Sequence, residues 1–592
     1  MKKTALIILL GIAISAFIYS CANVGYPTGG PLDKTPPKVI KTIPDNYALN
    51  FKGGKIEIFF DEFVQFKDIS ENFVISPPFK KKPLVKLKGR SIYLKLDEEL
   101  KENTTYTLDF GKGITDNNEN NPLGEYQFVF STGTSLDSLS IRGKVDNAFN
   151  ELPVEKSMVM AYLNTNDSVP LTLVPDYIAK TDSAGNFQLN HLQAGNYKLF
   201  ALVDGNRDYL YNGPGESMGF FDSIIKPSAH RFEQLDTIAE DSVVLKKYTA
   251  LEPTNVHIRM FEEKNPLQYL TTYKRSRREK LDFEFNAKRS DSLLIDFVRV
   301  KKKPDWFLLQ QNRTKDTLSY WITDPNIYQR DTLLAALQYL KTDSTGTLVT
   351  FMDTVKLNYK DPKKAKLSKK KKKKTKIKKP VYNFKVKTSS KQDLNRNISV
   401  QFNEPLAIIN LDSIHFFELK DTLKIPQTFK FVKDSGEILN YSLQTKWKSD
   451  TKYQVIIDSA AFQNIYGLYS DKFTGRITSR EQEYYGKLFL NVSGVKGPVL
   501  VQLLKSGKNE KVIKTKKIYS DQTVLFDYLA PETYIIKIIE DSNDNGLWDT
   551  GNYAQKLQAE QVYYFRKEIK LRSNWDVEEK INIPSNGIVI QP

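Results

Sequence analysis

The sequence predicts an all-β fold made of several sandwich domains. Apolar and polar residues alternate over short stretches, as at Ile56, Ile58 and Phe60, and this period of two is typical of strands with one buried face. The 34 Phe and 31 Tyr residues favour strands, and no long stretch has the spacing of an amphipathic helix. Because 592 residues are too many for one core, we expect about four to five domains.

Residues 1–20 have the features of a secretory signal peptide. Two lysines precede an apolar stretch from Ala5 to Ile18, and Ser20 stands directly before Cys21. This order of charge, apolar core and small residue predicts cleavage after Ser20. The apolar run is too short to favour a permanent membrane helix. Ser20 and Cys21 resemble the lipobox of bacterial lipoproteins, and the resemblance implies that Cys21 carries lipid.

The cysteine content agrees with this interpretation. Cys21 is the only cysteine of the chain, so it cannot form an intramolecular disulfide. The alternative is an unpaired thiol within a leader. Ala22 follows Cys21 where retention at the inner membrane would favour Asp. By resemblance to lipoprotein sorting rules, this implies a lipid anchor in the outer membrane, with the periplasmic face and the cell surface both open.

Residues 21–35 are rich in Gly and Pro and are predicted to form a flexible tether. Residues 22–35 could span at most ~50 Å when fully extended. The first predicted domain covers residues 36–133. Its period-two runs, separated by turn residues, predict an antiparallel β-sandwich.

The pattern of the first domain returns in residues 381–480, which indicates an internal repeat. The two copies share an alternating strand that ends in a carboxylate: Ile56-x-Ile58-x-Phe60-x-Glu62 and Ile398-x-Val400-x-Phe402-x-Glu404. They also share the segments Thr104-Thr105-Tyr106-Thr107-Leu108 and Thr451-Lys452-Tyr453-Gln454-Val455. Both copies resemble the bacterial Ig-like domain of S-layer and other envelope proteins.

A second repeat relates residues 137–247 to residues 482–592. Its two copies align without a gap at an offset of 337 residues: Leu192-Gln193-Ala194-Gly195-Asn196-Tyr197 and Leu529-Ala530-Pro531-Glu532-Thr533-Tyr534. Each is followed by an Asp-rich loop. The pair resembles the seven-stranded carboxypeptidase-regulatory domain, also called transthyretin-like. The resemblance implies a structural module rather than a catalyst.

Residues 250–360 also alternate, as at Leu281, Phe283 and Phe285, and we interpret them as a further sandwich of the Ig-like kind. The whole arrangement resembles the Ig-like-domain lipoproteins of Bacteroidota. It implies tandem Ig-like and transthyretin-like β-sandwiches in an elongated multidomain chain.

The net charge of +17 is concentrated in one segment. Residues 360–380 contain 13 lysines and one acid, and so hold +12 of the total. The predicted domains are therefore close to neutral, which argues against a nucleic-acid-binding protein. We predict that residues 361–380 form a solvated linker, because like charges repel each other. Contact with anionic lipid phosphates is the alternative.

Signatures of common enzymes are missing from the sequence. None of the four histidines lies in a His-Glu-x-x-His motif, and neither a Gly-x-Ser-x-Gly elbow nor a phosphate-binding Gly-x-x-x-x-Gly-Lys-Ser/Thr loop occurs. Glu62 and Glu404 recur at strand ends, where a turn or inter-strand partner is the simpler interpretation. The sequence thus predicts a protein that is not an enzyme.

A calcium site is the one chemical function that the residues suggest. Asp541, Asn543, Asn545 and Asp549 place oxygen ligands at alternate positions, and the carbonyl of Leu547 could add another. The bidentate Glu expected at position 12 is absent. The first copy offers a weaker set, because a tyrosine replaces the turn glycine: Asp204, Asn206 and Asp208. A metal-free Asx-turn is the alternative for both loops.

Fourteen Asp-Ser/Thr-apolar (or Thr) triplets are present, where average composition would give about two. They resemble the O-glycosylation acceptor of Bacteroidota, and six candidate acceptors are Ser138, Ser223, Ser292, Thr332, Thr354 and Ser413. The alternative is that Asp-Ser and Asp-Thr open strands after turns.

Together these features predict a non-catalytic cell-envelope lipoprotein that acts as a structural, spacing or binding scaffold. Its predicted partners are the membrane, through the lipid, and an unknown envelope protein or glycan, but no nucleic acid. Two alternatives remain: an envelope hydrolase that uses carboxylates between domains, and an accessory subunit of an outer-membrane assembly or export machine.

Overall fold

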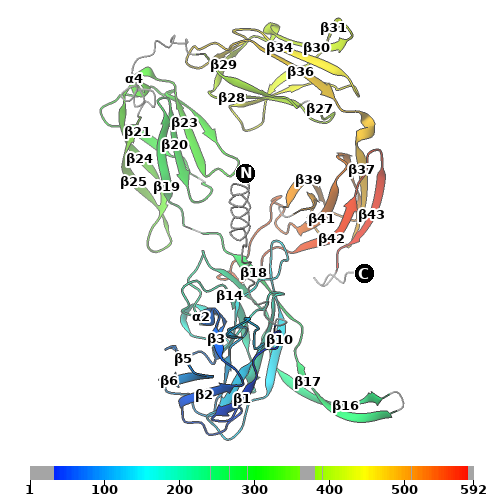
Figure 1. Cartoon of the computed structure of the whole chain (residues 1–592). Coiled ribbons are helices and arrows are strands. Elements are labelled where there is room, and N and C mark those ends of the chain that lie inside the picture. The colour runs from blue at the N-terminus through cyan, green and yellow to red at the C-terminus, as the bar shows by residue number, and fades with distance from the viewer. Residues whose placement is uncertain are drawn as a thin grey trace, which may run out of the picture. The chain divides into compact units, whose positions relative to one another are not determined.

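The computed structural model describes residues 33–239, 242–265, 267–289, 291–359, 381–389, 391–507 and 510–584. The predicted signal peptide, Cys21, most of the predicted tether and the lysine-rich segment 361–380 lie outside these residues. The predicted all-β fold class is confirmed (Figure 1). The α-helices of the described residues are single turns: α2 (Ile69–Asn72), α3 (Val169–Thr172) and α4 (Pro325–Tyr328). Within this part of the chain, no helix is long and apolar enough to cross a membrane.

The chain divides into two compact units. The first comprises Met1–Asp146, Pro153–Asn212 and Glu216–Met260, and the second comprises Asn147–Leu152, Gly213–Gly215 and Phe261–Pro592. Each unit contains an Ig-like domain and a seven-stranded domain, and the second unit contains a further sandwich.

The Ig-like domain of the first unit is a sandwich whose core follows the predicted alternation. One sheet has the order β1 (Val39–Ile43), β2 (Gly54–Phe60), β6 (Ser91–Leu96), β5 (Leu84–Lys88), and the other has the order β4 (Val74–Ser76), β7 (Thr105–Asp109), β9 (Gln127–Ser131). A third pair joins β3 (Val64–Phe66) to β8 (Ile114–Asp116). Ile56, Ile58, Leu94, Leu108 and Phe130 are fully buried between the sheets.

The Ig-like domain of the second unit repeats this topology and adds one strand at each edge of its second sheet. Its first sheet has the order β26 (Phe384–Lys387), β28 (Ile398–Phe402), β33 (Asn440–Gln444), β32 (Lys430–Lys433). Its second sheet has the order β27 (Lys391–Gln392), β36 (Phe473–Ser479), β34 (Lys452–Ile457), β30 (Ile414–Lys420), β31 (Leu423–Pro426). The small pair is β29 (Leu406–Ile409) with β35 (Phe462–Asn464). The predicted repeat is therefore confirmed at the level of strand order.

The second domain of the first unit has seven strands. Their order is β12 (Tyr177–Lys180), β11 (Met158–Tyr162), β14 (Lys198–Leu202), β15 (Ser217–Phe220), β18 (Val256–Glu262), β10 (Leu139–Asn147), β13 (Asn186–Leu192). β18 lies beyond the boundary predicted at residue 247. The reason is an inserted two-stranded ribbon, β16 (Ser228–Ala239) and β17 (Ser242–Glu252), which separates the sixth strand from the seventh (Figure 1).

The last domain has the same strand order without the ribbon. Four strands form the sheet β39 (Lys511–Ile518), β38 (Val499–Lys505), β41 (Thr533–Glu540), β42 (Val562–Lys570). Three strands form the sheet β40 (Gln522–Leu529), β37 (Gly486–Ser493), β43 (Asp576–Asn582). Only residues 571–575 connect β42 to β43. Leu490, Val501, Leu503, Phe526 and Ile538 are fully buried in its core.

Residues 270–358 form a sandwich of two sheets. The first has the order β19 (Leu270–Arg277), β20 (Lys280–Phe285), β23 (Thr317–Ile322), β22 (Phe307–Gln311), and the second has the order β21 (Leu294–Phe297), β24 (Thr332–Thr342), β25 (Leu348–Asn358). Aromatic residues fill its core, because Phe283, Trp306 and Tyr320 pack between the sheets.

Candidate functional site

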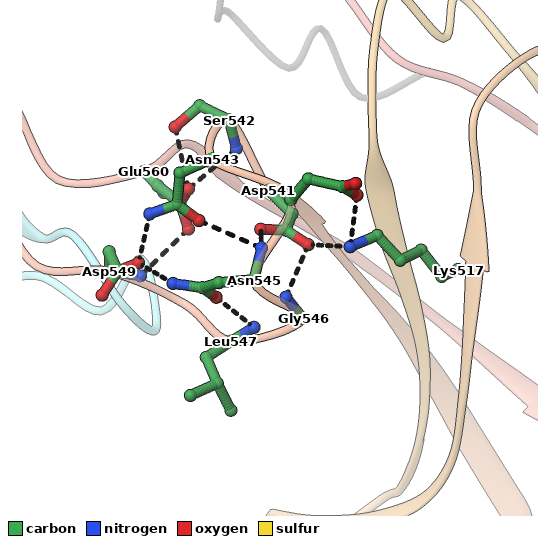
Figure 2. Close-up of polar contacts among 10 residues, drawn as sticks. Lys517, Asp541, Ser542, Asn543, Asn545, Gly546, Leu547, Asp549 and Glu560 are labelled. Carbon is green, nitrogen blue, oxygen red and sulfur yellow. Dashed lines mark hydrogen bonds and ion pairs between the residues drawn. The ribbon is translucent and has the colours of Figure 1, made fainter.

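The Asp-rich loop of the last domain follows β41 and is organised around Asp541, which is fully buried. Its Oδ1 accepts a hydrogen bond from the backbone N–H of Asn545 at 2.9 Å, and its Oδ2 accepts one from Gly546 at 2.9 Å (Figure 2). Gly546 has φ +77°, a backbone conformation that favours glycine over residues with a side chain. The sequence Asp-x-Asn-x-Asn-Gly therefore folds into an Asx-type turn around one carboxylate.

The ammonium group of a lysine on a neighbouring strand lies beside this carboxylate. Lys517, on β39, places Nζ 2.6 Å from Asp541 Oδ2 (Figure 2). The same atom lies 2.5 Å from Asp544 Oδ1. The hydrogen bond to Asp541, followed by the one to Asp544, raises the pKa of Lys517 above its ordinary value. The same lysine lowers the pKa of Asp544. The buried charge of Asp541 is thus compensated within the domain.

The other predicted ligands gather at Asp549. Its Oδ2 accepts hydrogen bonds from the amides of Asn543 and Asn545, the first at 2.7 Å (Figure 2), and its Oδ1 pairs with Lys264. Burial of Asp549 acts to raise its pKa, but Lys264 and the two amides outweigh this effect, so the pKa is lowered. Leu547 is 61% exposed at the tip of the loop.

Glu560 is a residue of this site that the sequence did not suggest. Its Oε1 accepts hydrogen bonds from both the N–H and the hydroxyl of Ser542 at 2.8 Å, and its Oε2 accepts one from the N–H of Asp549 at 2.9 Å (Figure 2). Glu560 is only 8% exposed. It ties the two ends of the loop together, and its position 11 residues after Asp549 falls outside any calcium-loop spacing.

This arrangement bears on calcium in two ways. In the described residues, no group of three or more His, Cys, Asp or Glu side chains is placed to hold a metal ion. Asp541 and Asp549 instead have lysine partners, and Asn543 and Asn545 direct amide donors at Asp549. A calcium ion would need these amides to present their carbonyl oxygens. Calcium binding therefore stays a prediction, with an Asx-turn as the geometry of the metal-free chain.

The corresponding loop of the first unit is also a hydrogen-bonded turn. Asp204 accepts hydrogen bonds from the N–H groups of Arg207 at 2.6 Å and Tyr209 at 2.9 Å. Tyr209, which replaces the glycine, has φ +62°, a left-handed conformation that is uncommon for a bulky residue. Asp208 accepts a hydrogen bond from the amide of Asn206 at 2.9 Å. The weaker predicted set thus adopts the same kind of turn.

Glu62 and Glu404 are the carboxylates that recur at the strand ends, and Glu404 has partners on other strands. Glu404 accepts hydrogen bonds from Arg277 at 2.9 Å and from the amide of Asn464. In the first copy, burial and then the charge of Asp116 raise the pKa of Glu62. Asp116 itself is buried and caps a turn, because it accepts backbone hydrogen bonds from residues 118–121. The contacts of Glu404 agree with a structural role for this glutamate.

The predicted glycosylation acceptors lie at the surface. Ser413 is half-buried and the other five acceptors are exposed: Ser138, Ser223, Ser292, Thr332 and Thr354. Some of the triplets also stand where a strand begins, as β24 does at Thr332 and β30 does directly after Ser413, whereas Thr354 lies within β25. Both interpretations of the triplets are therefore compatible with their placement, and glycosylation stays a prediction. Cys21 lies outside the described residues.

Comparison with known proteins identifies the first domain. Residues 33–132 match the family described as bacterial Ig-like domain. This match agrees with the sandwich formed by β1 to β9, so the chain contains a bacterial Ig-like domain. No curated protein matches the chain.

Solved structures with some likeness to the chain include three bacterial proteins. The major pilin subunit BcpA of Bacillus cereus is 12% identical, with 75% of this chain and 99% of the pilin covered and a TM-score of 0.14. The S-layer protein SbsC is 11% identical over 88% of this chain and 67% of its own, with a TM-score of 0.13. Alpha-2-macroglobulin from Escherichia coli is 10% identical, with 33% of this chain and 90% of the solved chain covered and a TM-score of 0.15.

Proposed function

We propose that this protein is a non-catalytic lipoprotein of the bacterial cell envelope, in which repeated β-sandwiches hold or space other envelope components. The observation that carries this proposal is the double repeat. An Ig-like domain and a seven-stranded domain occur twice with corresponding strand orders, and the second Ig-like domain adds β27 and β31 at the edges of one sheet, so the chain is built from repeated modules.

The finer form of the proposal concerns the kind of module and the anchor. The seven strands in two sheets of four and three, seen in residues 486–582, support the transthyretin-like interpretation. The leader and Cys21 support attachment to the outer membrane of a Bacteroidota-type cell through lipid. Under this proposal the tether, residues 21–35, separates the membrane from the first Ig-like domain.

The hydrolase alternative requires two carboxylates with opposite pKa tuning beside a cleft. Glu71 is the carboxylate beside the groove of the first unit that has a charged partner, Lys156, at 3.1 Å. This hydrogen bond lowers the pKa of Glu71, whereas a general acid needs a raised one. Glu71 therefore does not fit the role of the general acid in such a pair.

Chemical cross-linking in intact cells tests the proposal. The full-length chain, carrying an affinity tag, is purified from detergent-solubilised membranes and its cross-linked partners are identified by mass spectrometry. We expect envelope proteins to be recovered with the wild type. Cys21→Ser should abolish labelling by a radioactive fatty acid and release the chain from membranes, and so remove those partners.

Two outcomes would count against the proposal. If Cys21→Ser still fractionates with the outer membrane and carries labelled lipid, the lipoprotein interpretation is wrong. If the purified chain hydrolyses peptidoglycan or envelope polysaccharide, the non-catalytic interpretation is wrong. A recovered set dominated by the outer-membrane assembly machine would favour the accessory-subunit alternative.

A further inference from the structure

A groove of about 720 Å³ lies between the Ig-like domain and the seven-stranded domain of the first unit. Its volume falls within the range of about 300–1,000 Å³ that is typical of ligand sites. One wall comes from β4, β7 and β9 of the Ig-like sandwich, and the other comes from β12, β13 and the turn between them. Edge strands from two sheets therefore line one cavity.

Direct hydrogen bonds hold the two walls together. The hydroxyl of Ser76 accepts a hydrogen bond from the N–H of Ile178 at 3.0 Å, and Thr107 Oγ1 lies 2.9 Å from Nδ1 of His191. Lys180 donates to the carbonyl oxygen of Glu71. Because strands from both domains are joined at several points, the groove has a fixed width and its lining residues are pre-positioned for a ligand.

Charged residues of both signs line the groove, and some of them have partners within the protein. Glu71 and Lys156 form an ion pair at 3.1 Å. Asp182 caps the turn, since it accepts hydrogen bonds from the N–H groups of Ala184 and Asn186 at 2.8 Å. The lining contains five acidic and four basic side chains in all. The groove therefore lacks the single-sign charge that recognises a phosphate, a polyanion or a cation.

Amide side chains form a continuous row that crosses from the β13 wall of the groove to the β9 wall. Gln188 donates to Asn190 Oδ1 at 2.6 Å, Asn190 donates to Gln127 Oε1 at 3.4 Å, and Gln127 donates to Asp109 Oδ2 at 2.8 Å. Each amide has two N–H donors and a carbonyl with two lone pairs, so this row uses only part of its capacity. The unused donors and acceptors of this row match a ligand that also has both, such as a chain of hydroxyl groups.

Aromatic and apolar groups contribute little to this cavity. Phe187 is the aromatic residue in the lining, and it is only 4% exposed because its ring belongs to the domain core. A stacked nucleobase or an apolar ligand therefore finds no platform here.

From these observations we propose that the groove binds a neutral, hydroxyl-rich oligosaccharide, with the amide row from Gln188 to Gln127 as its hydrogen-bonding face. The inference rests on the proposed scaffold function and names the class of envelope component that the first unit would hold. An extended peptide is the competing occupant, because edge strands can also add a strand. The amide side chains and the balanced charge favour the glycan.

Binding is tested with the full-length chain in detergent. The probes are the neutral oligosaccharides maltohexaose, cellohexaose and chitohexaose, a sulfated and a uronic-acid oligosaccharide, and a set of extended heptapeptides, each titrated by calorimetry. We expect at least one neutral hexasaccharide to bind. Gln188→Ala should weaken its binding about 5–10-fold, the effect of one lost hydrogen bond. Ser183→Trp should abolish binding, because Ser183 is exposed at the groove and a large ring there would block it.

The matched control is Gln522→Ala, which removes an exposed amide from β40 of the last domain and should leave binding unchanged. Thermal melts of each variant exclude loss of the fold. The proposal is overturned if no neutral probe binds the wild type, if only the charged probes or the peptides bind, or if Ser183→Trp binds as well as the wild type. Should envelope proteins still be recovered by cross-linking in that case, the scaffold stands and only the glycan is excluded.

Discussion

Lys517 Nζ lies 2.6 Å from Oδ2 of Asp541, a carboxylate that is fully buried. The two residues are 24 positions apart and come from different segments, β39 and the loop after β41. Asp541 also accepts two backbone hydrogen bonds from its own loop. A buried carboxylate with a lysine and two amide donors is a structural centre of the domain, whatever else the loop binds.

The first prediction concerns the stability of this centre. Asp541→Ala removes the acceptor of the Asn545 and Gly546 N–H groups and leaves Lys517 without its buried partner. We expect the free energy of unfolding of residues 482–592 to fall by about 2–4 kcal/mol, measured by urea denaturation.

The matched control is Asp204→Ala in the first repeat, measured in the full chain. Asp204 is half-buried and also holds its loop through two N–H groups. The effect should be smaller, because less of the carboxylate is removed from solvent. An Asp541→Ala variant that unfolds at the same urea concentration as the wild type would show that the turn forms without its carboxylate.

The second prediction concerns calcium at the same loop. Any calcium ion bound by Asp541 must compete with the ammonium group of Lys517, so affinity in the wild type should be weak, on the order of 10⁻⁴–10⁻³ M. Lys517→Met removes the competitor. We expect millimolar calcium, compared with chelator, to raise the melting temperature of Lys517→Met more than that of the wild type, and to have no effect on Asp541→Ala. Identical melting curves for Lys517→Met with calcium and with chelator would leave the loop as an Asx-turn.

The sandwiches could be predicted because their signal is local. Ile56, Ile58 and Phe60 alternate within one strand and are all buried on one face. The period of two in the sequence is therefore enough to predict both the strand and its buried face. The internal repeats predicted that the two copies share a fold, and equivalent strands such as β2 and β28 do occupy equivalent places in their sheets.

The partners of the candidate site could not be predicted, because they depend on distant segments. Lys517 meets Asp541 only after two strands have paired with β38, and the sequence near Lys517 is an ordinary alternating strand. Glu560 is likewise separated from Asp549 by the segment 550–559, which no turn rule fixes. The spacing of the loop residues predicts a metal site, but it gives no sign of the lysine that the fold places beside Asp541.

The predicted end of the second domain, at residue 247, was wrong for a related reason. Residues 228–252 alternate like any strand pair, and the pattern does not reveal whether a strand enters a sandwich or pairs only in a ribbon. The short connection of residues 571–575 in the second copy was the available signal, since it shows where the seven-stranded fold closes without an insertion.

The third prediction concerns Lys537, a residue of β41 that is only 1% exposed. Its Nζ donates a hydrogen bond to the carbonyl of Phe149 at 2.8 Å and lies over the rings of Phe149 and Tyr564. Burial lowers the pKa of Lys537 to about 8, although Glu510 and Glu151 act to raise it. Phe200 stands at the aligned position of the first repeat, so this strand accepts an apolar side chain there.

Because the folded pKa is below the unfolded one, the unfolded chain binds more protons between about pH 8 and pH 10. The free energy of unfolding of the last domain should therefore rise with pH over this range in the wild type. Lys537→Met should flatten that rise and stabilise the domain at pH 7, as measured by urea denaturation at several pH values. Equal pH profiles for the two proteins would show that Lys537 is not desolvated.

The fourth prediction concerns the lysine-rich segment, which lies outside the described residues. Deletion of residues 363–379 should leave the melting temperature of the flanking domains within about 2 °C of the wild type, because a solvated linker adds no core. Tyr382→Ala, just beyond the segment, is the comparison: Tyr382 is 1% exposed and donates to the carbonyl of Glu404, so its loss should cost about 3–5 kcal/mol. A large loss of stability in the deletion would mean that the segment is packed.

The last prediction concerns the ribbon formed by β16 and β17 (Figure 1). The second copy of this domain closes the same seven-stranded fold with residues 571–575 in place of the ribbon, so the ribbon should not be needed for folding. Its first and last residues, Ser228 and Glu252, are paired across the ladder, and two glycines can join such a pair in a tight turn.

We therefore expect a chain in which two glycines replace residues 229–251 to keep the melting temperature of the first unit within about 2 °C. Ile225→Ala shows that the measurement is sensitive, because Ile225 is 7% exposed, exchanges backbone hydrogen bonds with Tyr197 and belongs to the core. Its truncation should cost about 2–5 kcal/mol. If the ribbon deletion is as destabilising as Ile225→Ala, the ribbon supports the sandwich directly. If the deletion melts like the wild type, the exposed stacked pair Phe232 and Tyr248 belongs to a segment that the fold does not require, and its loss can then be assayed for partner binding without a confounding loss of stability.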